Sequence, residues 1–273
     1  MTSYKLARPD GFDFRTGQTV NYREAIGGKV EAPDWNTRAE CGGGLHFSAN
    51  PLDCFVGAKI PCSAYIVRPG RERIEIDPKK SKARRLSVLS EVTDLDSLFG
   101  FNYTEAVSPV HPFKVKRRMP EPTKAEMDAL RRWASVGASV WDSVGASVWD
   151  SVDALRRWAS VWASVWDSVG ASVGASVGAS VGASVGASVR DSVGASVWDS
   201  VWDSVGASVG ASVRAYVGSL FPGVTNWRYI EHEFGVYPLA DAVYLWRRGL
   251  VPSFDGKLWR LHGANGIVWE GTS

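Results

Sequence analysis

The chain has 273 residues, enough for one or two ordinary domains, and its apolar fraction of 45% is normal for a folded protein. Its 31 basic and 29 acidic residues give a net charge of +2, which predicts no partnership with nucleic acid or an anionic membrane. No run approaches roughly 18 uninterrupted apolar residues, and the N-terminus has no apolar h-region. We therefore expect neither a membrane span nor a signal peptide.

Residues 1–96 are predicted to form a small α+β domain, because Gly and Pro separate short apolar runs. The β-branched run Ala64–Val67 and the alternation in Ile74–Ile76 predict strands. Gly42–Gly44 predict a tight turn, after which His46 begins a half-buried strand. Residues 97–121 are interpreted as a linker with a basic, Pro-rich end.

A helix is predicted at residues 122–132. Thr123 is a favourable N-cap, and Glu126 follows three residues later, which is the spacing of a capping box. We expect this helix to cap the segment that follows it.

Residues 133–217 are a tandem four-residue repeat in which the Ser-Val pair occurs 19 times. Asp128–Val136 (DALRRWASV) recurs as Asp153–Val161, displaced by 25 residues. Because 25 is not a multiple of four, the repeat must accept an extra residue there. We expect a bulge or a loop at residues 153–158.

The two halves of each repeat unit differ in how much they vary. The leading position is Gly, Trp or Arg, and a close-packed interior would not accept that exchange. The leading position is therefore expected to face outward, and the invariant valine inward. The predicted core comprises Val136, Val140, Val144, Val165, Val169, Val173, Val177, Val181, Val185, Val189 and Val193.

A period of four favours stacked short strands over a continuous helix. In an α-helix, the valine stripe would drift by about 40° per unit, and each Gly would cost about 1 kcal/mol relative to Ala. An even period instead keeps each position on one face of a strand. The predicted fold is therefore mainly β: a tetrapeptide-repeat β-solenoid flanked by a small α+β N-terminal domain and a small C-terminal α/β-hairpin module. Packed short helices and an irregular spacer are the alternatives.

Residues 218–273 are predicted to be a C-terminal capping module. Phe254–Lys257 lie between apolar runs, as expected of a hairpin turn. His262 precedes Gly263, so we interpret it as a turn residue rather than a ligand.

Two segments carry a family resemblance. Residues 39–54 (AECGGGLHFSANPLDC) resemble the signature of an N-terminal domain of unknown function in a group of uncharacterised phage and bacterial proteins. In that family the domain precedes short tandem repeats. Residues 245–263 (LWRRGLVPSFDGKLWRLHG) are similar to a C-terminal module that caps arrays of SVxx repeats. The resemblance implies the order of the parts, and no activity comes with it.

Candidate chemical groups are few. Cys41 and His46, with Asp53 and Cys54 downstream, could form a Cys–His pair with an activated thiolate, but structural roles in a turn and a strand are the preferred interpretation. The repeat carries a series of aspartates that lack the spacing of calcium sites and are interpreted as turn formers. They are Asp142, Asp150, Asp167, Asp191, Asp199 and Asp203. No metal site, cofactor or catalytic residue is assigned.

Eight of the thirteen Trp lie in the repeat, at its leading position. They are Trp133, Trp141, Trp149, Trp158, Trp162, Trp166, Trp198 and Trp202. Exposed Trp in number predicts an interface, although the flanking domains could cover it within one chain. We assign the interface to Trp141, Trp149, Trp162, Trp166, Trp198 and Trp202.

These features predict a structural or interaction scaffold that forms a homo-oligomer or binds a protein partner, rather than nucleic acid or membrane. The alternative is an enzyme whose N-terminal domain acts on a nucleotide or a small molecule, with the repeat as a stalk. Three cysteines without a disulfide framework favour the cytoplasm.

Overall fold

The computed structural model describes residues 2–136, 152–189, 195–225, 227, 230, 232–255 and 257–272, with the backbone alone at 152–158, 182–189 and 195–203. These residues form two compact units, divided after Thr104. Residues 152–160 belong with the first unit, and the described residues from 161 onward belong with the second.

Two antiparallel sheets build the first unit. One has the order β1-β4-β7-β2, from Ser3–Ala7, Ser63–Pro69, Arg85–Val92 and Lys29–Glu31, and the other has the order β3-β6-β5, from Leu45–Phe47, Lys80–Ala83 and Arg73–Asp77. Only Arg84 separates β6 from β7, so one stretch of chain passes from one sheet into the other. The strands predicted at Ala64–Val67 and Ile74–Ile76 are confirmed as parts of β4 and β5.

The core of the first unit takes side chains from both sheets, including Leu45, Tyr65 and Leu86, all at most 1% exposed. Short helical elements follow the strands: the 3-10 helix η1 (Pro51–Val56), α1 (Leu95–Phe99) and the start of α2 (Tyr103–Val107). The rings of Phe55, Phe99 and Tyr103 pack in sequence, with centroids 5.0 and 5.5 Å apart. This aromatic cluster attaches the helical elements to one another.

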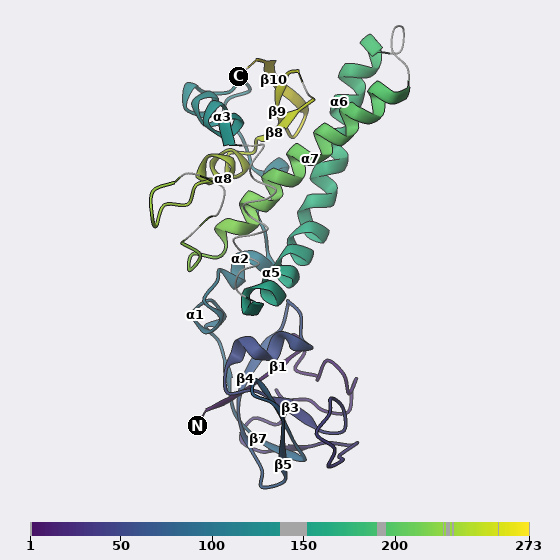
Figure 1. Ribbon diagram of the computed structural model, residues 1–273, viewed down its shortest axis with the longest axis vertical. Helices are drawn as coiled ribbons and strands as arrows, with labels where there is room; N and C mark the ends of the chain where they lie inside the picture. Colours follow the sequence, from purple (N-terminus) through teal and green to yellow (C-terminus); the bar gives the residue numbers. More distant parts are fainter. Residues whose placement is uncertain are drawn as a thin grey trace. The chain divides into compact units, whose positions relative to one another are not determined.

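The second unit is helical with one small sheet (Figure 1). Its described helices are the 3-10 helix η2 (Pro112–Lys114), α3 (Lys124–Val136), the end of α5 (Val152–Val165), the π-helix η4 (Trp166–Gly170), α6 (Ala171–Val189), α7 (Ala195–Ser219) and α8 (Ala240–Arg247). Its sheet has the order β10-β9-β8, from Gly266–Gly271, Trp259–Gly263 and Val251–Phe254. The capping box is confirmed, because Glu126 N donates to Thr123 Oγ1 and Thr123 N donates to the Glu126 carboxylate. The predicted hairpin turn is confirmed as well, since Phe254 of β8 pairs with Trp259 of β9.

The prediction of a mainly β solenoid is wrong. Every described residue of the repeat lies in a helix, and α6 and α7 run antiparallel side by side (Figure 1). The bulge or loop predicted at 153–158 is wrong too, because these residues lie in α5. The chain therefore has mixed helix and strand content, with three separate sheets among its described residues.

Three physical features offset the objections to a helix. A drifting valine stripe needs different partners around the helix, and α6 contacts both α7 and β10. The π-helix η4 has one residue more per turn than an α-helix. It therefore reverses part of the rotation of the valine stripe around the helix axis. The serines bond to their own helix, as when Ser176 Oγ donates to Ser172 O at 2.9 Å.

Candidate functional site

His46 lies on β3, directly after a turn of three glycines. Gly43 has φ +59°, and a Cβ there would lie 1.8 Å from Asn36 Nδ2, so only glycine fits. Lys82 secures the turn: its fully buried Nζ donates to Gly42 O at 2.9 Å and to Asn36 Oδ1 at 3.0 Å. The tight turn and half-buried strand predicted around His46 are therefore confirmed.

The turn fixes the tautomer of His46. Gly42 N donates to His46 Nε2 at 3.3 Å, so in the neutral ring the proton resides on Nδ1. Burial, together with smaller effects from the nearby cations Lys80, Lys5 and Arg15, lowers the pKa of His46 to about 4. His46 is thus a neutral N–H donor near physiological pH.

Asp13 holds the loop that faces His46. Its Oδ2 lies 2.6 Å from Lys5 Nζ and accepts from Tyr22 Oη, while its Oδ1 accepts from the backbone N–H groups of Arg15 and Thr16. Although burial opposes ionisation, Lys5 and these bonds lower the pKa of Asp13 overall. Its charge is therefore fully compensated within the domain.

Cys54 does not form a thiolate–imidazolium pair with His46. Its thiol donates to Tyr4 O at 3.3 Å, and burial raises its pKa to about 11. A protonated thiol beside a neutral imidazole is not an activated nucleophile. Cys41 lies elsewhere, exposed, with Lys80 Nζ 3.4 Å from its sulfur. The structure thus gathers His46, Asp53 and Cys54 around one cavity, without the chemistry of a cysteine nucleophile.

This cavity has a volume of about 50 Å³ and lies where β1 meets β3. Its lining includes Lys5, Arg15, His46, Asp53 and Lys80. An open groove of about 710 Å³ adjoins it, because Phe47, Ser48 and Lys80 line both hollows. We call them the His46 cavity and the β5 groove.

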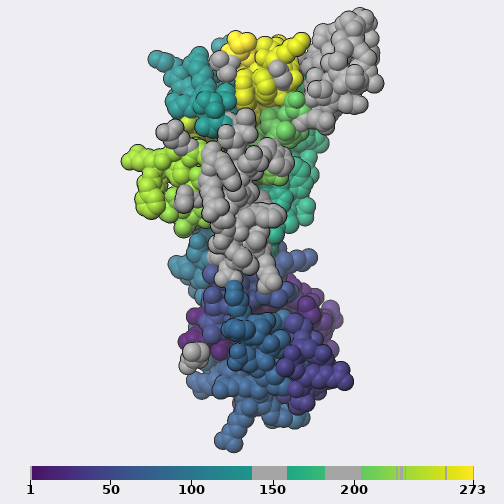
Figure 2. Space-filling view, in the orientation of Figure 1, coloured from purple at the N-terminus to yellow at the C-terminus, as the bar shows by residue number. Residues whose placement is uncertain are grey.

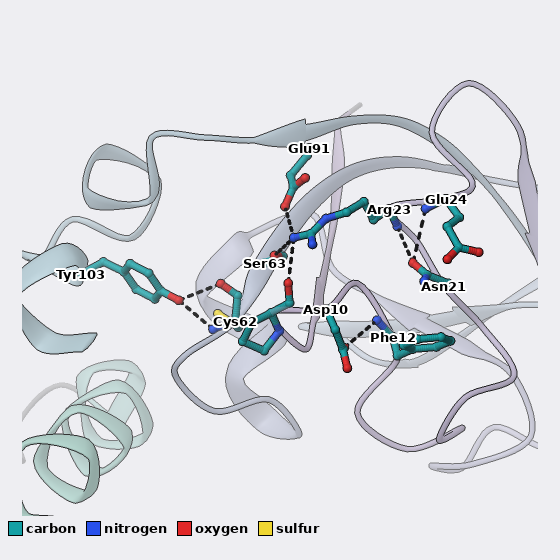
Figure 3. A network of polar contacts seen from close by, with 10 residues as sticks. Asp10, Phe12, Asn21, Arg23, Glu24, Cys62, Ser63, Glu91 and Tyr103 are labelled. Atoms are coloured by element: carbon teal, nitrogen blue, oxygen red, sulfur yellow. Dashed lines mark hydrogen bonds and ion pairs between the residues drawn. The ribbon is translucent and has the colours of Figure 1, made fainter. Parts of the chain in front are cut away.

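A second polar network in the first unit has a structural role (Figure 3). Arg23 Nη2 donates to Pro9 O at 2.7 Å and lies 3.2 Å from both Ser63 Oγ and Glu91 Oε1. Tyr103 Oη accepts from Cys62 N and donates to Cys62 O, each at 2.7 Å. These bonds attach the first loop and α2 to the sheet.

Among the described residues, no group of three or more His, Cys, Asp or Glu side chains could hold a metal ion.

The described valines of the repeat are buried in the second unit. Val165, Val169, Val173, Val177 and Val181 are at most 3% exposed, and Val136 is half-buried. The side chains of Val185 and Val189, and Val140, Val144 and Val193 entirely, lie outside the described residues. The leading position is not uniformly outward, since Gly170 and Gly178 are buried whereas the Ala and Ser between them face solvent.

Two tryptophans of the assigned interface can be placed. Trp162 and Trp166 are half-buried and stack with centroids 5.3 Å apart, and the Arg214 guanidinium lies 5.3 Å from the centre of the Trp162 ring. Burial lowers the pKa of Arg214 to about 10, so it keeps its charge at neutral pH. Trp141 and Trp149, and the side chains of Trp158, Trp198 and Trp202, lie outside the described residues. Trp133, expected to face outward, is instead only 1% exposed.

Of the six aspartates interpreted as turn formers, only Asp167 has a described side chain. Asp167 is exposed in the π-helix, so its interpretation as a turn former is wrong. Asp142, Asp150 and Asp191, and the side chains of Asp199 and Asp203, lie outside the described residues.

His262 was expected in a turn, but it lies in β9 and is 1% exposed. Its Nε2 is 2.7 Å from Ser253 Oγ on the neighbouring strand β8. Sequence reasoning missed this pair, and it missed the burial of the charged side chains of Lys82 and Glu126. A weak signal existed for His262 alone, because it follows Trp259 and Leu261, whose bulky side chains favour a strand.

Comparison with known families adds one match. Residues 1–99 match a domain of unknown function, DUF7666. The DUF7666 region covers the first unit's sheets and both hollows, which agrees with the N-terminal domain of unknown function expected from residues 39–54. No curated protein and no solved structure matched the chain. No helix in the described part of the chain has both the length and the apolar character needed to cross a bilayer.

Proposed function

We propose that the protein is an interaction scaffold, in which the helical repeat provides a regular surface for a protein partner or a second copy of the chain. The proposal keeps the role expected from the sequence and replaces the solenoid with the α6–α7 hairpin. The observation that carries it is the way in which the protein's own C-terminal sheet packs on the repeat.

The C-terminal sheet uses serines of the repeat as its contact points. Phe254 N donates to Ser208 Oγ of α7 at 3.1 Å, and Gly266 lies at the surface of α6 near Ser180 Oγ. Figure 2 shows this sheet in yellow beside the green surface of α7. The small Gly, Ala and Ser side chains of the GASV units allow such close approach, and only the serine recurs in every unit up to Val213. A surface that accepts one strand in this way offers equivalent positions to others.

The Trp162–Trp166 pair supplies the anchor that such a surface needs. Two stacked, half-buried indoles with a cation over one ring have the composition of an interface hot spot. Arg214 also holds Trp162 in place, which limits the entropy lost when a partner binds. The three cysteines are free, which supports the cytoplasm as the proposed location.

The test is the mass of the full chain by light scattering over a range of concentrations, with and without the double substitution Trp162→Ser, Trp166→Ser. Phe234→Ser is the matched control, because Phe234 is an aromatic side chain 82% exposed outside the repeat. We expect the parent and the control to associate and the double variant to stay monomeric. A parent that remains monomeric at high micromolar concentration contradicts self-association. Equal loss in the control contradicts the assignment to tryptophan.

The alternative is that the N-terminal domain acts on a nucleotide or a small molecule. The protonated thiol of Cys54 gives it no nucleophile, but the His46 cavity and the β5 groove favour a ligand there.

A further inference from the structure

We propose that the His46 cavity and the β5 groove together bind a small phosphorylated molecule, with the phosphate in the cavity and the rest of the ligand in the groove. This inference deepens the alternative function and does not depend on the scaffold role of the repeat. It rests on the donors around the cavity, on the placement of one carboxylate, and on the sizes of the two hollows.

The donors around the cavity are uncommitted. Among the described contacts, the Arg15 guanidinium has no carboxylate partner, and Lys80 Nζ contacts only the sulfur of Cys41. His46 presents its Nδ1–H, because Nε2 is occupied by Gly42 N. Lys5 is neutralised by Asp13 and adds no net charge. Two free cations and a fixed N–H donor are the groups that bind an oxyanion.

Asp53 gives the cavity a preference among oxyanions. Its carboxylate lines the cavity and has one neighbour there, the Ser48 hydroxyl 3.5 Å away. A carboxylate repels a fully deprotonated anion but accepts a hydrogen bond from one that still carries a proton. Inorganic phosphate still carries one proton near neutral pH, and a phosphate monoester takes one up as the pH falls through its second pKa of about 6. Sulfate carries none, so the cavity is expected to discriminate against it.

Size separates the roles of the two hollows. The cavity, at about 50 Å³, is somewhat larger than the roughly 30 Å³ that one water occupies in the liquid, so it accepts a single compact group. The groove, at about 710 Å³, lies within the roughly 300–1,000 Å³ range typical of pockets for small molecules. Arg68 and Arg73 line the groove together with Glu75 and Asp77, so a neutral, hydroxylated ligand body suits it.

Calorimetric titration of the full chain with inorganic phosphate, and with sulfate at matched ionic strength, tests the cavity. We expect phosphate to bind and sulfate to bind at least tenfold more weakly. Arg15→Gln and Lys80→Gln should each weaken phosphate binding about tenfold or more, because a charge-assisted bond contributes about 1.4 kcal/mol or more. The matched control is Arg71→Gln, an exposed cation that lines neither hollow. Asp53→Asn should reduce the preference for phosphate over sulfate.

Ribose 5-phosphate as a second probe tests the groove. Arg73→Gln should weaken its binding and leave inorganic phosphate unaffected. Absence of phosphate binding at millimolar concentration, or equal loss in Arg71→Gln, overturns the proposal for the cavity. Equal affinity for inorganic phosphate and ribose 5-phosphate overturns the role of the groove. Neither result bears on self-association, which is measured separately by light scattering.

Discussion

The carboxylate of Glu126 is fully buried and accepts both Nη groups of Arg117, at 3.0 and 3.2 Å. Arg248 Nε and Thr123 N donate to the same carboxylate. One side chain thereby joins the start of α3 to the preceding segment and to the end of α8. Burial alone would raise the pKa of Glu126, but Arg117 and the backbone of Thr123 lower it to about 2.

Glu126→Gln is expected to destabilise the second unit by about 3 kcal/mol, because it leaves the half-buried Arg117 without its counterion. Urea unfolding followed by tryptophan fluorescence measures the change. Glu121→Gln is the control, since that side chain is exposed and only its carbonyl contacts Arg117. The contribution of Glu126 is present above its ordinary pKa of 4.5 and is lost as the pH falls toward 2. Similar stability of the two variants would contradict this role.

The buried Ser253–His262 pair predicts a second pH dependence. Burial, with a smaller effect from Arg260, lowers the pKa of His262 from 6.5 to about 4. The unfolded chain therefore takes up a proton below pH 6.5, whereas the folded chain does so only near pH 4. This contribution is complete above pH 6.5 and decreases as the pH falls from 6.5 to 4.

Denaturant unfolding of the parent and of His262→Gln across that pH range checks the effect. The slope of the free energy of unfolding against pH reports how many more protons the unfolded chain binds than the folded chain. We expect this number to be smaller in the variant than in the parent by about one proton. His46 has a similarly low pKa and is present in both proteins, so the difference isolates His262. Parallel slopes in the two proteins would refute the assignment.

Local signals in the sequence predicted local structure well. Thr123 and Glu126 formed their capping box, and the alternation at Ile74–Ile76 became β5, because each depends on neighbours only a few residues away. The bidentate bond from Arg117 and the contact of Arg248 with Glu126 depend on tertiary folding, so no spacing in the sequence indicated them.

The repeat shows where a correct observation led to a wrong fold. The invariance of valine indicated its burial, as Val173 and Val177 illustrate. The period of four argues against a helix only if the helix packs against one partner along one of its faces. Because α6 packs against both α7 and β10, a drifting stripe finds partners on more than one face. The sequence indicated His46, Asp53 and Cys54 of the candidate site but not its cations, because Lys5, Arg15 and Lys80 meet only in the folded domain.

Two glycines of the repeat are expected to respond oppositely to the same substitution. A Cβ at Gly170 would lie 2.7 Å from Cε3 of Trp166, so Gly170→Ala must displace the indole and should cost about 1–3 kcal/mol. A Cβ at Gly174 meets nothing within 4 Å, so Gly174→Ala should stabilise α6 by about 1 kcal/mol through helix propensity. Thermal unfolding of both variants gives the comparison. Changes of the same sign would show that Trp166 does not lie over Gly170.

The inward and outward faces of the repeat are tested by placing one charge on each. Val177 is 0% exposed in α6, whereas Ala175, two residues earlier in the same helix, is exposed. Val177→Asp puts a carboxylate among apolar side chains and should cost about 3–5 kcal/mol. Ala175→Asp adds the same charge on the exposed face and loses only helix propensity, so it should cost about 0.7 kcal/mol or less.

Urea unfolding of the two variants and the parent measures both costs, and far-UV circular dichroism at zero denaturant reports whether the helix persists. If Val177→Asp does not fold, its loss of helical signal beside a folded Ala175→Asp gives the same answer. Equal costs would mean that valine and alanine have been assigned to the wrong faces. A β-type spectrum in the parent would contradict the helical repeat itself, because α6 and α7 together account for most of the described repeat residues.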